Sequence, residues 1–340
     1  MPDSSATLGE MIDDAIQTLA GYTAQQEQAT HLTSGIDAVT LAFTVADGSV
    51  IRKGQVEIGG ELLWVESVSG GTVTIAPYGR GYRSTTAAAH TAGSRVVVQP
   101  MFPRSSVHRE INNTIAAISD DVYGIAAANI TYDGPTIAHE LPAADFPGVD
   151  AVLDVTWQTE SVTDVWLPVR RFRFRQFAAS DAFPSGNVLE LMDPIMPGAE
   201  VRVVFKQAAQ MFPDYRTAAL AFLRENYPEY ANSPDDVVLG LLASLVPPDV
   251  AESQRLTTAT YLPSSCRDLV VLGAVSALAW GVDLSKASQV GPSPDQIDES
   301  RGGGQSAALA RQLFQRFQLR LEAERNKLLS AVPAAVRYER

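Results

Sequence analysis

The apolar positions of the first 130 residues change their period twice, from helical to alternating and back. Thr7 followed by Glu10 has the pattern of a capping box, which pairs two otherwise unsatisfied amide donors. Apolar residues then follow the i, i+3, i+4 spacing of one helix face as far as Gly21, a typical terminator. They are Leu8, Met11, Ile12, Ala15, Ile16 and Leu19. We predict an N-terminal amphipathic helix followed by a polar linker over residues 23–30.

Alternating apolar and polar residues between positions 31 and 100 predict about five short strands. The segments are 39–45, 55–58, 62–65, 73–75 and 95–98, with glycine-rich connections. This pattern is typical of a small antiparallel barrel or sandwich. Helical spacing then returns, with Ser105 or Ser106 as the cap. Its apolar stripe is Val107, Ile111, Ile115, Ile118 and Val122. Each flanking helix has one apolar face to bury, so the β-module is predicted to be an insertion in a helical domain.

The second half of the chain repeats the order of strands and then helices. Strands are predicted at 151–157, 165–177, 188–191 and 200–205, forming a two-sheet sandwich. Ser233-Pro234-Asp235-Asp236 marks the start of a helix over 237–246, and Ser265 and Asp268 can cap a longer helix through Ala279. Arg301-Gly302-Gly303-Gly304 is predicted to be a flexible hinge before the final helix, which Val332-Pro333 ends or breaks.

These patterns predict an α+β protein. A helical bundle is interrupted by a small antiparallel β-barrel or sandwich module and by a second β-sandwich, and it closes with a long C-terminal helix. The expected divisions are residues 1–30 and 101–128 (helical core), 31–100 (inserted β-module), 129–212 (β-sandwich), 213–300 (helical bundle) and 301–340 (hinge and docking helix).

Composition narrows the class of protein. A length of 340 residues is enough for two or three domains. No apolar run approaches the ~18 residues of a membrane span, so we expect no membrane partner. The first residues lack the pattern of a signal peptide. A lone Cys266 excludes an internal disulfide framework and fits synthesis in a reducing cytoplasm. The net charge of −13 argues against wrapping nucleic acid, which needs a surplus of Lys and Arg.

That charge is unevenly distributed. Residues 305–340 carry seven basic and three acidic side chains, a net of +4, so the rest of the chain carries −17. An amphipathic basic helix after a hinge is suited to ordering on a partner. The docking candidates are Arg311, Arg316, Phe317, Arg320, Leu321 and Arg325. In the alternative interpretation the helix packs into its own bundle, with Leu309, Leu313, Phe317 and Leu321 as core. Both can hold, since the charged face would remain free.

A second cluster of cations lies on one strand. In Arg171-Phe172-Arg173-Phe174-Arg175 the guanidinium groups fall on one face and the phenyl rings on the other. Three arginines about 7 Å apart need acidic partners. We expect these from a neighbouring copy, which makes Arg171, Arg173 and Arg175 inter-subunit candidates. Contact with DNA phosphates is the alternative.

No pattern of residues predicts catalysis, a metal site or a cofactor. The four histidines are scattered, and a single cysteine cannot build a zinc site. The Gly79-to-Ser84 stretch superficially matches a dinucleotide loop, but strands surround it and no helix opens on it, so a turn or long hairpin is expected. The acid pairs Asp13-Asp14, Asp120-Asp121 and Asp235-Asp236 point about 100° apart on a helix and do not converge easily.

Several segments together resemble proteins of tailed-phage virions. A β-module recurrent in those proteins carries the motif R-G-x-x-G-T-T-A-A-x-H, and the chain follows it from Arg80 to His90 with Ser84 in place of the second glycine. Residues 267–274 and 320–324 look like the closing helices of head-to-tail adaptor (connector) proteins. The other matching segments are Gly60–Val65, Gly93–Val96 and Phe102–Asn112.

The resemblance implies a structural protein of the virion neck, between capsid and tail. Such adaptors form a ring, usually of twelve copies, beneath the portal protein. The ring extends the channel through which DNA passes without specific binding, and it presents a platform to the next neck or tail protein (stopper, terminator or tail tube). By position, residues 305–340 match the portal-engaging end. The acidic body fits the neighbourhood of passing DNA, because like charge keeps phosphates from adhering.

Two other functions remain open at this point. The chain could be a tail or baseplate protein whose β-modules bind the host surface. It could also be a carbohydrate-active enzyme built on β-sandwiches, which would need two convergent carboxylates in an aromatic-lined cleft. Trp64, Trp157, Trp166 and Trp280 show no such grouping in the sequence.

Overall fold

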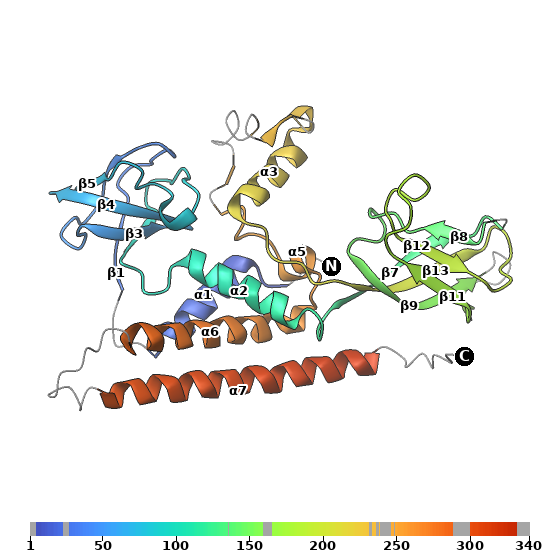
Figure 1. The fold of residues 1–340 in the computed structure, drawn as a ribbon. Coiled ribbons are helices and arrows are strands. Elements are labelled where there is room, and N and C mark those ends of the chain that lie inside the picture. Colours follow the sequence, from blue (N-terminus) through green and yellow to red (C-terminus); the bar gives the residue numbers. More distant parts are fainter. Residues whose placement is uncertain are drawn as a thin grey trace. The chain divides into compact units, whose positions relative to one another are not determined.

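The fold is α+β, with several antiparallel sheets and a long C-terminal helix (Figure 1). The computed structural model describes residues 5–22, 27–134, 136–158, 165–230, 233–235, 238, 246–247, 249–287 and 300–331. The chain divides into two compact units. The first comprises residues 1–115, 211–260 and 264–320, and the second comprises residues 116–210, 261–263 and 321–340.

Six short strands form the β-module of the first unit. They are β1 (Gln28–His31), β2 (Ala42–Thr44), β3 (Gly54–Ile58), β4 (Glu61–Ser69), β5 (Thr72–Ile75) and β6 (Arg95–Val98). All pairings are antiparallel, in the order β1-β6-β3-β4-β5-β2. The order is open, so this is not a closed barrel, although an isolated bridge between Leu32 and Val45 joins its two edges. Val56, Ile58 and Val65 belong to the module's apolar core.

The five predicted strands of this module are present, and β1 is an addition to them. It lies partly inside the segment expected to be a polar linker, and Thr30 is the buried side chain among its four residues. Its hydrogen bonds come from β6, with which it pairs from Gln28 opposite Val98 to His31 opposite Arg95. A partner strand some 65 residues away in the chain, rather than an apolar pattern, therefore makes β1 a strand.

Helices surround the module in sequence. They are α1 (Leu8–Ala20), α2 (Arg104–Ile118), α3 (Tyr215–Asn226), α5 (Leu256–Thr260), α6 (Arg267–Ala287) and α7 (Ser300–Ala331), with 3-10 turns η1 (Tyr82–Ser84), η2 (Pro228–Tyr230) and η4 (Ser264–Cys266). The predicted capping box of α1 is confirmed: the Glu10 N–H donates to Thr7 Oγ1 at 3.2 Å, and the Thr7 N–H donates to Glu10 Oε2 at 3.0 Å.

The predicted apolar stripe of α2 is buried throughout. Its expected caps are wrong, however. The helix begins at Arg104, so Ser105 and Ser106 lie inside its first turn. The helix also ends at Ile118, and the buried Val122 follows it in a turn. Similarly, α6 begins at Arg267 directly after η4, which places Asp268 inside its first turn.

The helices of the first unit meet closely at Gly273 of α6. A Cβ atom there would come 2.3 Å from Thr114 Cγ2 of α2 and 3.0 Å from the Phe317 ring of α7. Glycine is therefore required by the approach of two neighbouring helices. Figure 1 shows α7 alongside α6, and α1 packs on α6 as well.

The expected hinge at Gly302–Gly304 is wrong, because these residues lie in the first turns of α7. A glycine costs a helix about 1 kcal/mol relative to alanine. At a helix start, however, the N–H groups lack an intrahelical acceptor in any case. The long helix-forming segment that follows propagates through them, since propagation is easier than nucleation.

Helix α3 follows the sandwich strands and was not predicted as a separate element. Asp214 caps it by accepting a hydrogen bond from the Thr217 N–H at 2.7 Å. Its buried residues, such as Leu220 and Leu223, share a small core with Val250. The predicted helix over 237–246 and the break at Val332-Pro333 lie almost wholly outside the described residues.

Seven strands form the second unit's sandwich. They are β7 (Gly124–Thr131), β8 (Ala138–Glu140), β9 (Val149–Gln158), β10 (Leu167–Pro168), β11 (Phe172–Arg175), β12 (Val188–Leu191) and β13 (Glu200–Gln207). The sheets have the orders β10-β9-β13-β7 and β11-β12-β8. Val203 and Phe205 of the first sheet share an apolar core with Leu189 and Leu191 of the second.

The sandwich differs from the prediction at its start and in its middle. The expected long strand over 165–177 is split into β10 and β11. Strand β7 begins at Gly124, before the expected boundary at 129, and it is rich in alanine, which disfavours strands. It pairs with β13 along its whole length, so tertiary pairing overrides its weak local preference.

Candidate functional site

The predicted docking helix has a face that packs within its own unit. Leu313 and Phe317 are buried, with the Phe317 ring against Gly273. The Arg320 guanidinium donates to the carbonyl oxygen of Ser265 at 3.3 Å. Leu313 and Phe317 are therefore core residues, as in the bundle interpretation, whereas Arg320, a docking candidate, is half-buried beside them. Leu321 is half-buried.

Other side chains of the same helix face solvent. Arg311 and Arg316 are exposed. So are Phe314 and Leu319, at 46% and 68% of their full areas. Arg325 lies 3.4 Å from Asp121 in the second unit, in a pair whose side chains are 60% and 37% exposed. Sequence reasoning missed Phe314 and Leu319 because it followed the single stripe from Leu309 to Leu321.

The arginines around β11 alternate as predicted, with Arg171, Arg173 and Arg175 exposed. Their acidic partners lie in the same chain, however. Arg171 Nε donates to Asp193 Oδ1 at 2.8 Å, and Arg175 Nη1 donates to Glu190 Oε1 at 2.7 Å. Arg173 has no ion pair within the described part of the chain. Arg171 and Arg175 are thus paired without a second copy, whereas among these three arginines Arg173 lacks an acidic partner in the described residues.

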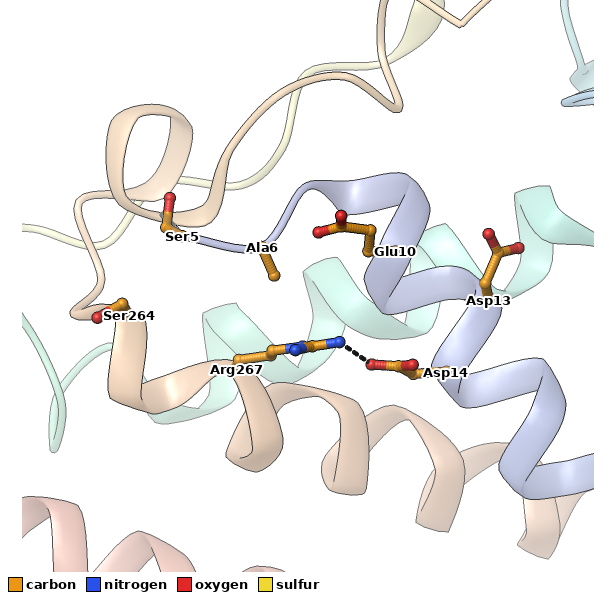
Figure 2. Close-up of a pocket in the computed structure, with 7 residues that line it drawn as sticks. All are labelled: Ser5, Ala6, Glu10, Asp13, Asp14, Ser264 and Arg267. Atoms are coloured by element: carbon orange, nitrogen blue, oxygen red, sulfur yellow. Dashed lines mark hydrogen bonds and ion pairs between the residues drawn. The ribbon is translucent and has the colours of Figure 1, made fainter. Parts of the chain in front are cut away.

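A pocket of about 530 Å³ opens between α1 and the start of α6 (Figure 2). Glu10, Asp13 and Asp14 line one side, and Arg267 forms an ion pair with Asp14 across it. Each carboxylate already has a task, since Glu10 caps α1 and Asp13 pairs with Arg104. Asp13 and Asp14 point to different partners, as expected for consecutive residues on a helix.

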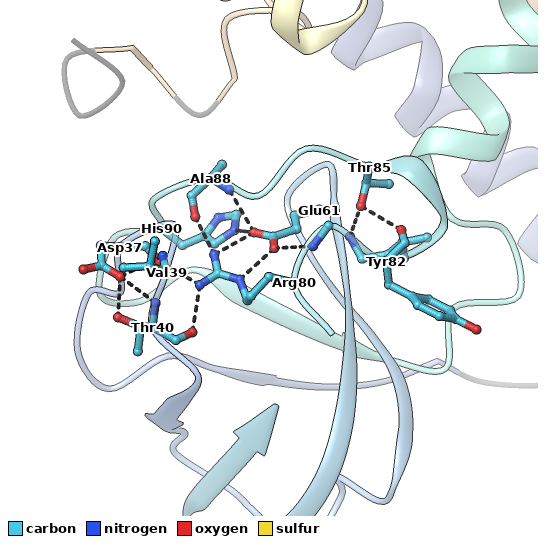
Figure 3. A network of polar contacts seen from close by, with 11 residues as sticks. Asp37, Val39, Thr40, Glu61, Arg80, Tyr82, Thr85, Ala88 and His90 are labelled. Carbon is cyan, nitrogen blue, oxygen red and sulfur yellow. Dashed lines mark hydrogen bonds and ion pairs between the residues drawn. The ribbon is translucent and has the colours of Figure 1, made fainter. Parts of the chain in front are cut away.

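The motif from Arg80 to His90 builds a buried polar network in the β-module (Figure 3). Its centre is Glu61, which is 1% exposed. Arg80 donates to Glu61 from Nε at 2.7 Å and from Nη2 at 2.9 Å. His90 Nε2 lies 2.9 Å from Glu61 Oε2, and the Ala88 N–H donates to the same oxygen at 3.1 Å. Because an ionised carboxylate only accepts, Nε2 carries the proton of the ring.

The remaining donors of Arg80 fix the loops around the network. They bond to the carbonyl oxygens of Asp37, Thr40 and Ala88 at 2.7–2.9 Å. Burial acts to raise the pKa of Glu61, but hydrogen bonds from Arg80, His90 and Ala88 outweigh it and lower this pKa to about 2. The carboxylate is therefore a structural centre that stays ionised, rather than an acid–base group near neutral pH.

The motif segment also carries backbone strain. Gly81, Arg83 and Ser84 have φ angles of 62°, 55° and 64°. Ser84 stands where the resembling modules carry glycine, and the left-handed conformation explains that preference. No α-helix opens on the segment after Gly79, as the dinucleotide-loop interpretation would need; instead Tyr82–Ser84 forms the 3-10 turn η1, and the Tyr82 ring packs on Trp64 with 5.1 Å between ring centroids.

A second polar cluster, in which Glu57 is buried and Asp13 is exposed, surrounds Arg104 at the start of α2. Its guanidinium forms two hydrogen bonds with Glu252, at 2.8 and 2.6 Å, and one with Asp13 at 2.5 Å. Its N–H donates to Glu57 Oε1 of β3 at 2.7 Å. Burial raises the pKa of Glu57, which is 4% exposed, to about 8 despite the hydrogen bond and charge of Arg104. Sequence reasoning missed this cluster, whose members lie up to 239 positions apart in the chain.

Within the described residues, no group of three or more His, Cys, Asp or Glu side chains is arranged to hold a metal ion. In the described part of the chain, no helix is both long and apolar enough to span a membrane. No protein-family model, no curated protein and no solved structure matches the chain.

Proposed function

We propose that this chain is a structural virion protein, a head-to-tail adaptor of a tailed phage. In this proposal copies of the chain, twelve in the usual ring, assemble beneath the portal protein. They extend the DNA channel and present a platform to the next neck or tail protein, without chemical turnover. Synthesis takes place in the host cytoplasm and the finished protein resides in the neck of the particle.

The observation that carries the proposal is that the motif from Arg80 to His90 forms the buried polar network around Glu61. Arg80 and His90, which stand near its two ends, meet on the buried Glu61. The intervening residues supply the backbone donor of Ala88 and the left-handed turn at Ser84. The motif is thus the internal frame of the module. A likeness in such frame residues supports kinship of the module, because they must change together to keep the network satisfied.

The docking role of α7 is supported by its solvent-facing side. Arg311 and Arg316 supply cations, while Phe314 and Leu319 supply apolar contact area. Arginine and aromatic side chains are enriched among the residues that dominate protein interfaces. The buried side of α7 holds the helix in place, so the exposed side can be presented without ordering the whole segment.

Charge reversal on α7 tests this role directly. In Arg311→Glu/Arg316→Glu the packed residues Leu313 and Phe317 are untouched, so the protein should fold normally by circular dichroism. We expect it to lose attachment to portal-bearing, DNA-filled heads by at least tenfold in co-sedimentation. The matched control is Arg52→Glu/Lys53→Glu, at two exposed cations of the β-module, which should attach like the wild type. Attachment of the α7 variant at the wild-type level would remove the helix from the mechanism.

Removing residues 305–340 is a blunter test, since it also takes Leu313 and Phe317 from the helical packing. Imaging of the protein in intact particles addresses the whole proposal, because it gives copy number and neighbours together. Absence from mature particles, or conversion of a small substrate at enzymatic rates, would overturn the proposal.

One observation favours a second candidate, a tail or baseplate protein that binds the host surface. Val39 and Tyr78, on neighbouring loops of the β-module, are 78% and 98% exposed. Arg80 holds the loop around Val39 in place by donating hydrogen bonds to the carbonyl oxygens of Asp37 and Thr40. Labelling of the protein at the tail tip rather than at the neck would favour this candidate.

A further inference from the structure

The β-module joins the helices of its unit through one buried carboxyl group. Glu57, in the centre of β3, accepts a hydrogen bond from the N–H of Arg104, the first residue of α2. Its backbone is held in the sheet by pairing with Leu62 of β4 and Val97 of β6. The side chain therefore connects a rigid sheet to the beginning of a helix.

The charges around Glu57 are unbalanced. Arg104 of α2 supplies one positive charge, but it already binds two carboxylates, Glu252 from the turn before α5 and Asp13 from α1. Glu27, just before β1, adds a further negative charge. Glu27 pairs with Arg95 of β6 at 3.8 Å, in a partly exposed contact. The three acids of the joint thus outnumber its two cations, Arg104 and Arg95, even while Glu57 is neutral.

No other nearby group of α2 changes this balance. His108, one turn after Arg104, is half-buried, and burial lowers the pKa of its ring and disfavours a positive charge there. The charges of Glu252 and Asp214 act on His108 in the opposite direction, with less effect. The neighbouring residues on β4 and β6, Leu62 and Val97, carry no charge.

We propose that Glu57 is a proton-operated latch, whose neutral carboxyl group fastens the β-module to the start of α2 and whose ionisation loosens that joint. An ionised Glu57 would add a buried negative charge near Glu252 and Glu27, while Arg104 is already shared between Glu252 and Asp13. Opening the joint brings water to Glu57 and relieves this cost. The inference rests on the geometry of the joint and is independent of the proposed role in the virion.

The sign of the pH dependence follows from the direction of the shift. Burial raises the pKa of Glu57 to about 8, well above its value in an opened chain. The closed joint therefore binds the proton more tightly than the open one. Closure is fully favoured below about pH 4.5 and weakens progressively up to about pH 8, after which it changes no further.

Hydrogen exchange of the full-length chain tests the latch. The amide of Arg104, in peptides spanning residues 101–107, and the amides of β3 report opening of the joint once intrinsic exchange rates are divided out. Between about pH 6 and pH 9 we expect the opening constant in the wild type to rise roughly 10- to 100-fold. Amides of β13 in the other unit serve as the internal reference and should not follow this rise.

The matched variant is Glu57→Gln, which keeps the acceptor for the Arg104 N–H and cannot ionise. Its opening constant should be the same at both pH values. An equal rise in wild type and variant, or no rise in the wild type, would overturn the latch.

If Glu57→Gln disturbs folding, a second variant, Glu27→Gln, tests the latch without changing Glu57 itself. Glu27→Gln removes a partly exposed charge that raises the pKa of Glu57. It should shift the midpoint of opening to lower pH by a few tenths of a unit, and an unmoved midpoint would count against the latch.

Discussion

The β-module and the β-sandwich are both antiparallel and both have apolar cores, yet they place their charges differently. In the module, Glu61 and Arg80 form a pair whose side chains are 1% and 7% exposed. In the sandwich, Arg171 pairs with Asp193 and Arg175 with Glu190, with the arginine side chains 68% and 52% exposed. The same chemical groups therefore work in two different dielectric surroundings.

The difference in burial indicates on which ion pairs the stability of the fold depends. A buried pair must be kept whole, because removing one partner leaves a charge that neither water nor protein compensates. An exposed pair is screened by solvent and its loss is nearly neutral. The module therefore adds a buried polar centre to its apolar core, whereas the core of the sandwich consists of apolar residues such as Val203 and Phe205.

The largest effect is expected from breaking the buried pair. Arg80→Met keeps much of the side-chain volume but leaves the Glu61 carboxylate without its guanidinium. We expect the module to lose on the order of 3–5 kcal/mol of stability. Segment-resolved hydrogen exchange measures this loss through the amides of β3 and β4. Unchanged protection of these strands would show that the network is not central to the module.

Acid should weaken the β-module by a similar amount, because it protonates the buried Glu61. The folded pKa of Glu61, about 2, is below its ordinary value of 4.5, so its stabilisation is present above about pH 4.5. It is lost as the pH falls from about 4.5 toward 2 and amounts to roughly 3 kcal/mol. Acid titration followed by exchange in β4 should show this loss, and Glu61→Gln should remove the pH dependence. An identical acid profile in the variant would assign the loss to other carboxyl groups.

A smaller gain is expected at the strained turn of the module. Ser84 has a φ of 64°, which glycine adopts without the steric cost that a Cβ atom brings. Ser84→Gly should raise the module's stability by about 0.5–1 kcal/mol, measured as an increased midpoint in thermal unfolding. Ser69→Gly, at the end of β4, is the control and should give no gain. A loss in Ser84→Gly would mean that the serine side chain contributes more than its strain costs.

The smallest effect completes the comparison in the sandwich. Arg175→Met removes an exposed pair with Glu190, and we expect a change of less than about 1 kcal/mol in the stability of β11 and β12. The same measurement as for Arg80→Met applies; the two arginines differ in burial and in the number of hydrogen bonds that each donates. A loss in the sandwich as large as that in the module would contradict the distinction drawn between the two regions.

Local signals explain how much of the fold was predictable. The capping box at Thr7 and Glu10 and the apolar stripe of α2 need only residues within a few turns, and both were found. Strands with their own alternation, such as β3 and β13, were also found. The missed strands, β1, β7 and β8, take their hydrogen bonds from β6, β13 and β12 and carry little pattern of their own.

The candidate site was predictable only in outline. The basic surplus of α7 is visible in the sequence, but the direction in which each arginine points is not. Packing on α6 turned Phe317 and Arg320 inward and left Arg311 and Arg316 outside. The sequence does not show that Arg171 and Arg175 have acidic partners in the same chain. Strand register places Glu190 of β12 opposite Arg173 and within reach of Arg175, and this register cannot be read from composition.

By itself the sequence determined the class of fold, the positions of the strongly periodic elements, the uneven charge and the motif of the β-module. These features depend on residues that are close together in the sequence, and the backbone sets the geometry between such residues. Tertiary structure alone decided which charges are buried and with what partners. Contacts between remote segments determine the burial and the ionic partners of Glu57, Arg104 and Glu252, because burial and electrostatic environment are properties of the packed chain.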